Sequence, residues 1–236
     1  MSTLLLRLAA PLQSWGVDAK FDRRGTQSIP TKSGVIGLVA AALGRRRDEG
    51  IDDLQSLRFG VRVDQAGDLL RDYHTAKSVK STYVTNRYYL SDAVFLVGLQ
   101  GVETLLKEID TALRIPTFPL FLGRRSCPPE GKISLGIRTN KNLVEALQEE
   151  EWLISDWLRR KEAKYVQLPI VVEVEKETGG AYYIRDNPIS FDQNHRKFGF
   201  RLVTEIEAKV VINNESRHTV QGDTTAHDPM QELRGE

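Results

Sequence analysis

Hydrophobic residues along the first 140 positions follow two alternating spacings. Short apolar runs are typical of buried strands, whereas apolar residues three and four positions apart are typical of helices. The pattern predicts strand, helix, strand, strand, helix and strand over residues 3–9, 31–43, 57–64, 93–99, 102–113 and 132–138. Thr31 is suited to cap the first helix and Gly44 to end it.

Beyond residue 140 the pattern predicts one helix and several strands. Residues 143–162 are acidic and place five apolar side chains near one helical stripe, namely Leu143, Leu147, Ile154, Trp157 and Leu158. Residues 169–175 and 181–185 flank a Thr-Gly-Gly turn and predict a β-hairpin. Residues 198–212 alternate in the manner of a strand.

These elements together predict an α+β protein. Residues 1–140 have the element order of a ferredoxin-like βαββαβ domain. Residues 141–212 are expected to form the acidic helix and a smaller β-rich C-terminal module. Residues 213–236 are polar and are predicted to be a disordered tail.

The composition is that of a folded protein in a reducing compartment. Apolar residues make up 40% and charged residues 28% of the 236 residues. The single cysteine, Cys127, excludes an internal disulfide framework and a Cys-based zinc site. Arg7 interrupts the N-terminal apolar run, and no other run approaches the roughly 18 residues of a membrane span. We therefore expect a cytoplasmic protein with no membrane partner.

Basic residues are concentrated in three segments, although the net charge of the chain is only +1. Lys and Arg outnumber acids by seven to one in residues 20–47, four to one in residues 71–91 and six to one in residues 114–141. Arg45 to Arg47 would also complement the dipole at the end of the first helix. Folded onto one face, the three segments would form a polyanion site, and on separate faces they would be ordinary solvated surface.

Two segments carry the chemistry of anion binding. The first helix offers free backbone N–H groups at its start, together with Lys32 and Ser33, so a phosphate could bind there. The sequence FLGRRSCPP combines Phe121 with Arg124 and Arg125, which could hold a nucleic-acid backbone and stack a base. An ordinary helix cap and a solvated turn are the alternative interpretations.

His74 is the histidine with the most suggestive neighbours. Together with Tyr73, Tyr83 and Lys77 it could cleave RNA without a metal, because His or Tyr can move the 2′-hydroxyl proton while Lys stabilises charge on the phosphate. The histidine could equally orient a loop by hydrogen bonding. We expect no catalytic residue and no metal site or cofactor, and we keep this set as the alternative.

Four segments taken together resemble a known family. They are LLLRLAAPLQSWG at residues 4–16, PTKSGVIGLVAAALG at 30–44, RDYHT at 71–75 and LGRRSCPP at 122–129. In order and spacing they resemble family five of the CRISPR-associated proteins, within the RAMP superfamily, in its type I-E form. The resemblance implies an RRM-like (RAMP) first domain with an inserted thumb at about 71–92 and a glycine-rich loop at about 117–131.

The resemblance also implies a function in antiviral defence. Type I-E members are non-catalytic subunits of the Cascade ribonucleoprotein complex, where they cap the crRNA at its 5′ handle and contact the CasC backbone subunit and the large CasA subunit. They meet target DNA only through the complex. Type I-C members cleave the repeat, so a metal-independent pre-crRNA endoribonuclease is the alternative. A protein-only scaffold that touches no RNA is a third possibility.

Predicted RNA-binding residues follow from the basic segments and from the match to the family. They are Gln13, Ser14, Trp15, Arg23, Arg24, Lys32, Ser33, Arg87, Phe121, Arg124 and Arg125. Arg87 corresponds to the thumb arginine and would brace the nucleotide at the handle boundary. Trp15 and Phe121 would stack bases if exposed, although both could be core residues. The remaining basic side chains would neutralise phosphates.

Overall fold

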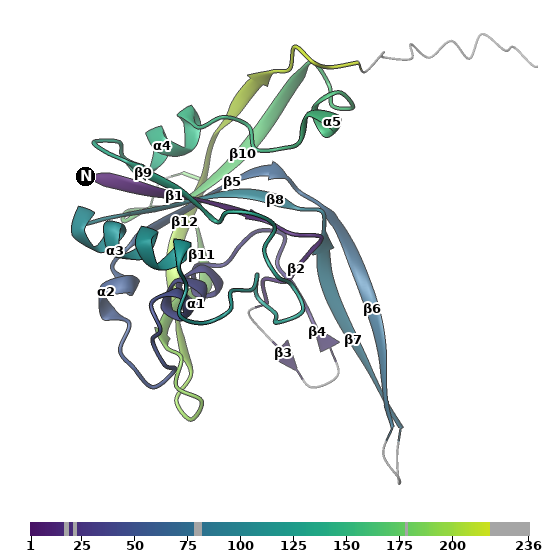
Figure 1. The fold of residues 1–236 in the computed structure, drawn as a ribbon, viewed down its shortest axis with the longest axis vertical. Coiled ribbons are helices and arrows are strands. Elements are labelled where there is room, and N and C mark those ends of the chain that lie inside the picture. Colours follow the sequence, from purple (N-terminus) through teal and green to yellow (C-terminus); the bar gives the residue numbers. More distant parts are fainter. Residues whose placement is uncertain (17–18, 21–22, 78–81, 178, 218–236) are drawn as a thin grey trace, which may run out of the picture.

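The computed structural model describes residues 1–16, 19–20, 23–77, 82–177 and 179–217. Within them, seven strands form the central sheet, namely β1 (Ser2–Ala9), β5 (Arg58–Gln65), β8 (Val94–Gly101), β9 (Ser134–Arg138), β10 (Tyr165–Glu173), β11 (Tyr182–Ser190) and β12 (Lys197–Ile212). Their order is β11-β12-β10-β5-β8-β1-β9, and all neighbours are antiparallel (Figure 1). The predicted combination of helices with a β-sheet in an α+β class is confirmed.

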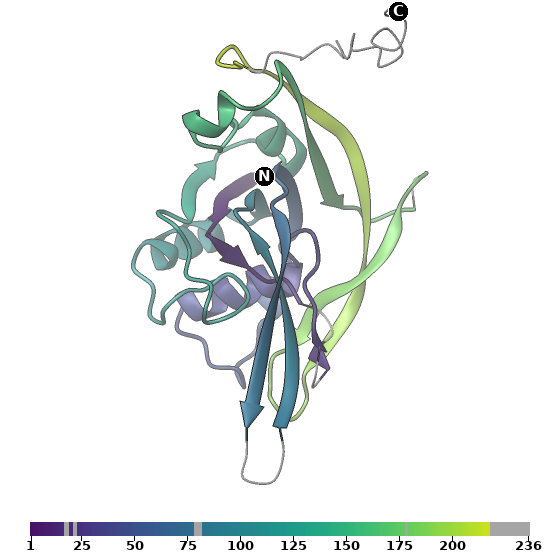
Figure 2. The same ribbon diagram turned by 90° about the vertical axis from the view of Figure 1, so that its right-hand side faces the viewer.

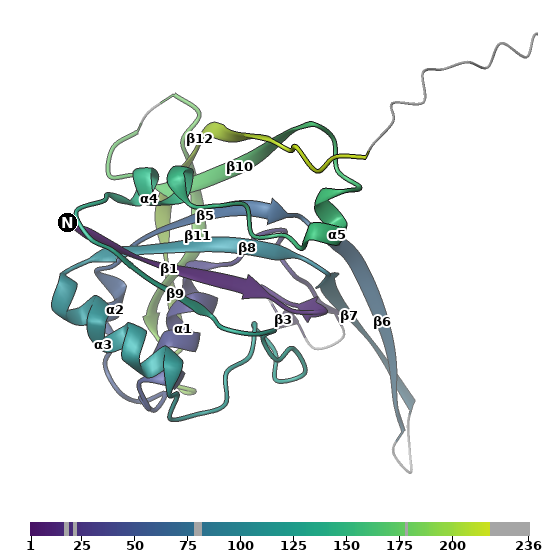
Figure 3. The same cartoon turned by 45° about the horizontal axis from the view of Figure 1, so that its top comes forward.

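The helices cover both faces of this sheet. They are α1 (Lys32–Ala42), α2 (Asp52–Gln55), α3 (Glu103–Arg114), α4 (Leu143–Glu149) and α5 (Asp156–Arg159). Figure 3 shows α1, α2 and α3 on one side of the sheet and α4 on the other. Because side chains alternate along β1, Leu4, Leu6 and Leu8 pack toward α1 and α3, and Leu5 packs toward α4.

The ends of α1 follow the predicted capping chemistry. The Thr31 side-chain oxygen accepts a hydrogen bond from the Gly34 N–H at 3.2 Å, which satisfies one of the free donors of the first turn. After the last turn, Gly44 has φ +79°, a left-handed conformation that glycine adopts without strain. The helix predicted over 31–43 is therefore confirmed.

The single helix predicted over residues 143–162 is wrong, because α4 and α5 are separated by a non-helical segment. The Arg62 guanidinium, which is 0% exposed, donates to the carbonyls of Leu147, Glu150 and Glu151 at 2.6–2.7 Å. Leu147 lies in the last turn of α4 and the other two acceptors follow the helix directly, so Arg62 satisfies carbonyls at the point where α4 ends. Trp157, predicted on the apolar stripe, is 61% exposed.

The hairpin predicted from residues 169–175 and 181–185 is also wrong. β12 lies between β10 and β11 and pairs with both, so the two segments share no ladder. β12 has 16 residues, and it pairs with β11 along residues 197–203 and with β10 along residues 203–212. Pairing of β10 with β5 joins these C-terminal strands to the first four strands in one sheet.

A two-stranded hairpin projects from the body at the segment predicted to be the thumb. It consists of β6 (Asp68–Lys77) and β7 (Thr82–Ser91), and it extends well beyond the helices (Figures 1 and 2). Short strands lie against its base, namely β2 (Leu12–Gln13), β3 (Ala19–Lys20) and β4 (Arg23–Arg24). β4 runs parallel to β7, which brings the residue 23–24 segment beside Arg87.

Residues 213–217, the first part of the predicted disordered tail, are ordered and hydrogen-bonded to the body of the protein. The side-chain amide of Asn213 donates to the carbonyls of Arg159 and Ala163, and the Arg217 N–H donates to the carbonyl of Arg160. Residues 218–236, the rest of the predicted tail, lie outside the described residues. Among the helices that the structure describes, none is long and apolar enough to span a bilayer.

Candidate nucleic-acid interface

The predicted residues after the first strand are inside the protein. The Trp15 ring is 1% exposed, and its indole N–H donates to the side chain of Gln13 at 3.1 Å. Gln13 in turn donates to the carbonyls of Leu8 and Ala93, and the Ser14 hydroxyl donates to the carbonyl of Tyr88. The prediction that Trp15 stacks a base is wrong for this fold, because the ring is packed in the core.

Lys32 is also buried, and the prediction that it binds phosphate is wrong. Its ammonium lies 3.0 Å from a carboxylate oxygen of Glu173, with only 3% of the side chain exposed. Burial lowers the pKa of Lys32, and the nearby Glu173 carboxylate partly opposes that shift. This cation therefore neutralises an acid of β10.

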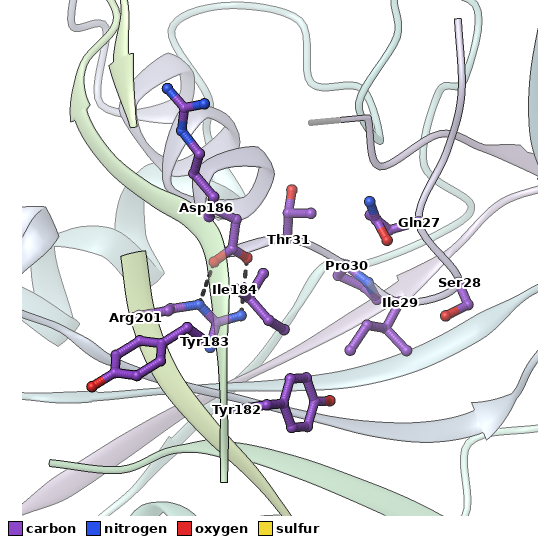
Figure 4. A pocket seen from close by; sticks show the side chains of 11 residues that line it. Gln27, Ser28, Ile29, Pro30, Thr31, Tyr182, Tyr183, Ile184, Asp186 and Arg201 are labelled. Atoms are coloured by element: carbon purple, nitrogen blue, oxygen red, sulfur yellow. Dashed lines mark hydrogen bonds and ion pairs between the residues drawn. The ribbon is translucent and has the colours of Figure 1, made fainter. Parts of the chain in front are cut away.

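The start of α1 already has an anion of its own. The Asp186 carboxylate accepts the Lys32 backbone N–H at 2.8 Å and two hydrogen bonds from the Arg201 guanidinium at 2.5 and 2.9 Å. Figure 4 shows this ion pair in the wall of a pocket that Thr31 and Tyr182 also line. Asp186 thus occupies the anion position that the sequence assigned to a phosphate.

Two predicted arginines from distant segments converge on Tyr89. The guanidinium carbon of Arg124 lies 4.6 Å from the centre of the Tyr89 ring, and interactions with both Arg124 and Arg87 lower the pKa of the Tyr89 hydroxyl. Arg124 also donates to the carbonyl of Arg24 at 2.9 Å. We call these residues, Arg24, Arg87, Tyr89 and Arg124, the thumb–loop junction. The side chain of Arg23 lies outside the described residues.

The electrostatics of the junction favour an anion. Burial raises the pKa of Tyr89, but polar interactions with Ser126, Arg124 and Arg87 and the charge of Arg124 outweigh it, so the pKa lies below its usual value. The Nε of Arg87 and the Nη1 of Arg124 are buried and have no hydrogen-bond acceptor within the described residues. Buried donors without acceptors are costly, and an incoming anionic oxygen would satisfy them.

A second group of predicted residues lines a cleft of about 470 Å³ beside α1. Ser33, Phe121 and Arg125 all contribute to its wall. Sequence reasoning missed the other charged and aromatic lining residues, which are Arg45, Arg46, Arg47, Phe118, Phe191 and Arg196. We call this the arginine cleft. The basic 20–47 segment contained a signal for residues 45–47, but local sequence does not show that residues 191–196 meet them.

The alternative catalytic set is divided between two faces of the hairpin. His74 pairs with Thr85 and Tyr83 with Ala76 in the β6–β7 ladder, which places His74 and Tyr83 on one face. Tyr73 and Lys77 alternate with His74 along β6 and therefore lie on the other face. His74 contacts the Asp72 carboxylate at 2.5 Å. Across the described part of the chain, no three His, Cys, Asp or Glu residues are grouped to hold a metal.

Comparison with known proteins identifies the family. The family described as CRISPR-associated protein (Cas_Cas5) matches residues 3–204, which is most of the chain. The chain belongs to this Cas5 family. The Cas5 chain is 36% identical over 159 residues to the Escherichia coli (strain K12) protein named "CRISPR system Cascade subunit CasD", covering 57% of this chain and 70% of the relative.

Two solved structures resemble the Cas5 chain over nearly all of its length. A chain from "Crystal structure of Cas protein" is 39% identical with a TM-score of 0.69, and the alignment covers 92% of this chain and 98% of that one. A chain from "CRISPR RNA-guided surveillance complex" is 32% identical with a TM-score of 0.72, covering 93% and 95%. The family match includes both the thumb–loop junction and the arginine cleft.

Proposed function

We propose that this chain is a non-catalytic subunit of a type I-E Cascade complex and binds the 5′ handle of the crRNA. The observation that supports this most strongly is that Arg87 of the hairpin and Arg124 of the 121–127 loop both lie beside Tyr89. Each of these arginines has a buried N–H group without an acceptor among the described residues, so the two segments form one potential anion site. RNA backbone supplies the anionic oxygens that the two free N–H groups require. Arg87 would thereby brace the nucleotide at the handle boundary.

The proposed fold assignment is a ferredoxin-like RAMP domain. The strands β5, β8, β1 and β9 are adjacent in that order, which places the second, third, first and fourth strands of a βαββαβ unit side by side. The domain would comprise residues 1–140 with the thumb and the glycine-rich loop, followed by the 141–212 module. A cytoplasmic location belongs to the same proposal.

The proposed protein partners are the CasC backbone subunit and the large CasA subunit, with target DNA reached through the complex. The relatives named for Cascade and for an RNA-guided surveillance complex support this assembly. The hairpin also has an apolar face suited to a protein, since Leu69, Tyr73 and Val84 are 65%, 62% and 42% exposed. Arg87 lies on the opposite face, so RNA and protein would contact the hairpin from different sides.

The endoribonuclease alternative is disfavoured by the hairpin geometry. General acid–base cleavage needs its groups around one phosphate, but His74 and Lys77 point to opposite faces of a two-stranded ribbon. Asp72 also engages the His74 ring directly.

The test is RNA binding and RNA integrity measured on the same sample. The purified full chain is incubated with end-labelled CRISPR repeat RNA in a chelator and run on matched native and denaturing gels. We expect a shifted, intact RNA. Cleavage that His74→Ala abolishes would replace the proposal with the endoribonuclease.

A matched pair of variants locates the binding surface. Arg87→Ala with Arg124→Ala should weaken handle binding and reduce the slope of log affinity against log salt by about 1.4, at roughly 0.7 for each phosphate that is no longer neutralised. Lys107→Ala with Arg160→Ala removes the same charge from exposed positions on other faces and should leave the slope unchanged. Equal slopes for the two variants would show that the junction does not bind RNA.

A further inference from the structure

The arginine cleft is lined by charge of one sign. Its five arginines come from three separate segments, the 45–47 turn, the 121–127 loop and the 191–196 loop, and no carboxylate is among its described lining residues. A concave surface with cations on several sides concentrates positive potential. The fold therefore assembles in space a charge cluster that is dispersed along the chain.

Three of the five guanidinium groups are available to a ligand. Arg45 is held by the Asp53 carboxylate through two hydrogen bonds of 2.5 Å, and Arg46 lies 3.9 Å from Asp48. Arg47 and Arg125 are exposed and have no acidic partner in the described part of the chain, and Arg196 lies over the Phe198 ring at 5.5 Å. Arg47, Arg125 and Arg196 are thus the cations that an anionic ligand can reach.

The cleft also presents aromatic rings next to these cations. Phe118 is 44% exposed, and Phe121 and Phe191 are half-buried at the lining. Gly37 of α1 lies beside Phe191, since a Cβ there would be in ordinary contact with the ring at 3.6 Å. Rings beside arginines are the combination that single-stranded nucleic acid uses, with bases on the rings and phosphates on the guanidinium groups. An acidic peptide would use the arginines but would leave the rings without a partner.

The geometry points to the arginine cleft as a second binding site for single-stranded RNA, continuous with the thumb–loop junction; this rests on the proposed function. Arg124 and Arg125 are consecutive, yet Arg124 contacts Tyr89 and the carbonyl of Arg24, whereas Arg125 lines the cleft. Gly123 beside them is exposed, so the surface between the junction and the cleft is open to solvent. One RNA segment therefore passes from the junction over this loop into the cleft.

The first test removes the three available cations. Arg47→Ala, Arg125→Ala and Arg196→Ala are combined in the full chain, and anisotropy of labelled repeat RNA is measured over a range of salt. The slope of log affinity against log salt should fall by about 2, at roughly 0.7 for each phosphate. The control variant carries Lys107→Ala, Arg160→Ala and Lys164→Ala, all on exposed positions away from the cleft, and should keep the original slope.

A second measurement leaves the protein unaltered. Repeat RNA carrying 4-thiouridine at successive positions is photocrosslinked to the wild-type chain, and the crosslinked peptides are mapped by mass spectrometry. Crosslinks within residues 118–125 or 191–196, from positions adjacent to those that reach Arg87, are expected. Phe121→Ala should weaken binding about 5- to 160-fold, the range expected when one base no longer stacks on a ring.

The outcomes separate this inference from the proposed function. If the triple cleft variant behaves as the control while Arg87→Ala with Arg124→Ala still weakens binding, the cleft assignment fails and the proposed function stands. If neither variant changes RNA binding, both fail. If the cleft variant keeps RNA binding but no longer assembles with partner subunits, the cleft is a protein-binding surface and the RNA assignment is overturned.

Discussion

At the scale of single residues, Asp186 connects two elements that are far apart in the sequence. It is 1% exposed and joins the first turn of α1 to Arg201 of β12. Arg201 also lies over the Phe59 ring at 5.0 Å, so the pair is enclosed by aromatic and helical atoms. A buried ion pair of this kind contributes little net stability when complete, but removal of one charge leaves the other buried without compensation.

We predict that Asp186→Asn lowers the free energy of unfolding by about 3 kcal/mol, because Arg201 then remains charged and buried without a counter-ion. Urea denaturation followed by circular dichroism measures this change. Asp48→Asn is the matched control, since Asp48 is 72% exposed and surface changes stay within about 0.5 kcal/mol. A loss for Asp186→Asn no larger than that of the control would contradict the prediction.

At the scale of elements, the 121–127 loop is held by close backbone packing. The Leu122 carbonyl accepts the Ser14 N–H at 3.1 Å, and the Leu122 N–H donates to the Cys127 carbonyl at 2.8 Å. Gly123 has φ +85°, and a Cβ at this position would lie only 1.6 Å from the Ser14 carbonyl oxygen. The loop therefore fits against the segment that follows β2 only with glycine at this position.

We predict that Gly123→Ala displaces the loop and weakens RNA binding although every arginine is retained. The stability loss should be about 1–3 kcal/mol, the usual cost of forcing atoms into a packed site. Gly179→Ala serves as control, because no atom lies within 4 Å of a Cβ there. Affinity is measured by anisotropy and stability by urea denaturation. Wild-type affinity in Gly123→Ala would show that loop position is unimportant for binding.

At the scale of the whole molecule, local patterns predicted the N-terminal elements but not the long-range contacts. Apolar periodicity found β1, α1 and α3, because each buries a face that its own sequence encodes. It could not show that Arg62 of β5 hydrogen-bonds to a carbonyl in the last turn of α4. Nor could it show that Asp186 accepts a backbone N–H of the first turn of α1 from 154 residues away. Trp15 and Lys32 were predicted to contact RNA but are buried, because burial depends on the assembled sheet, and the RNA contacts of Arg87, Arg124 and Arg125 stay predictions.

The hairpin gives a prediction about assembly. Replacement of residues 73–86 by Asn-Gly joins Asp72 to Arg87, which face each other in the ladder, through a turn that suits a short hairpin. The described side chains that this replacement removes are exposed or half-buried, so the melting temperature should stay within about 3 °C. We expect RNA binding to persist and co-purification with the other Cascade subunits to fail. Normal co-purification would show that the outer hairpin is not a subunit contact.

The ion pair at the start of α1 has a consequence for synthesis on the ribosome. Asp186 emerges 154 residues after Lys32, and the edge of β5 stays unpaired until β10 has been made. At about 5–20 residues per second this interval lasts about 8–30 s. During it the nascent chain presents an open strand edge and an incomplete core, both of which favour aggregation and degradation. A chain cut short before β10 would remain in that state permanently.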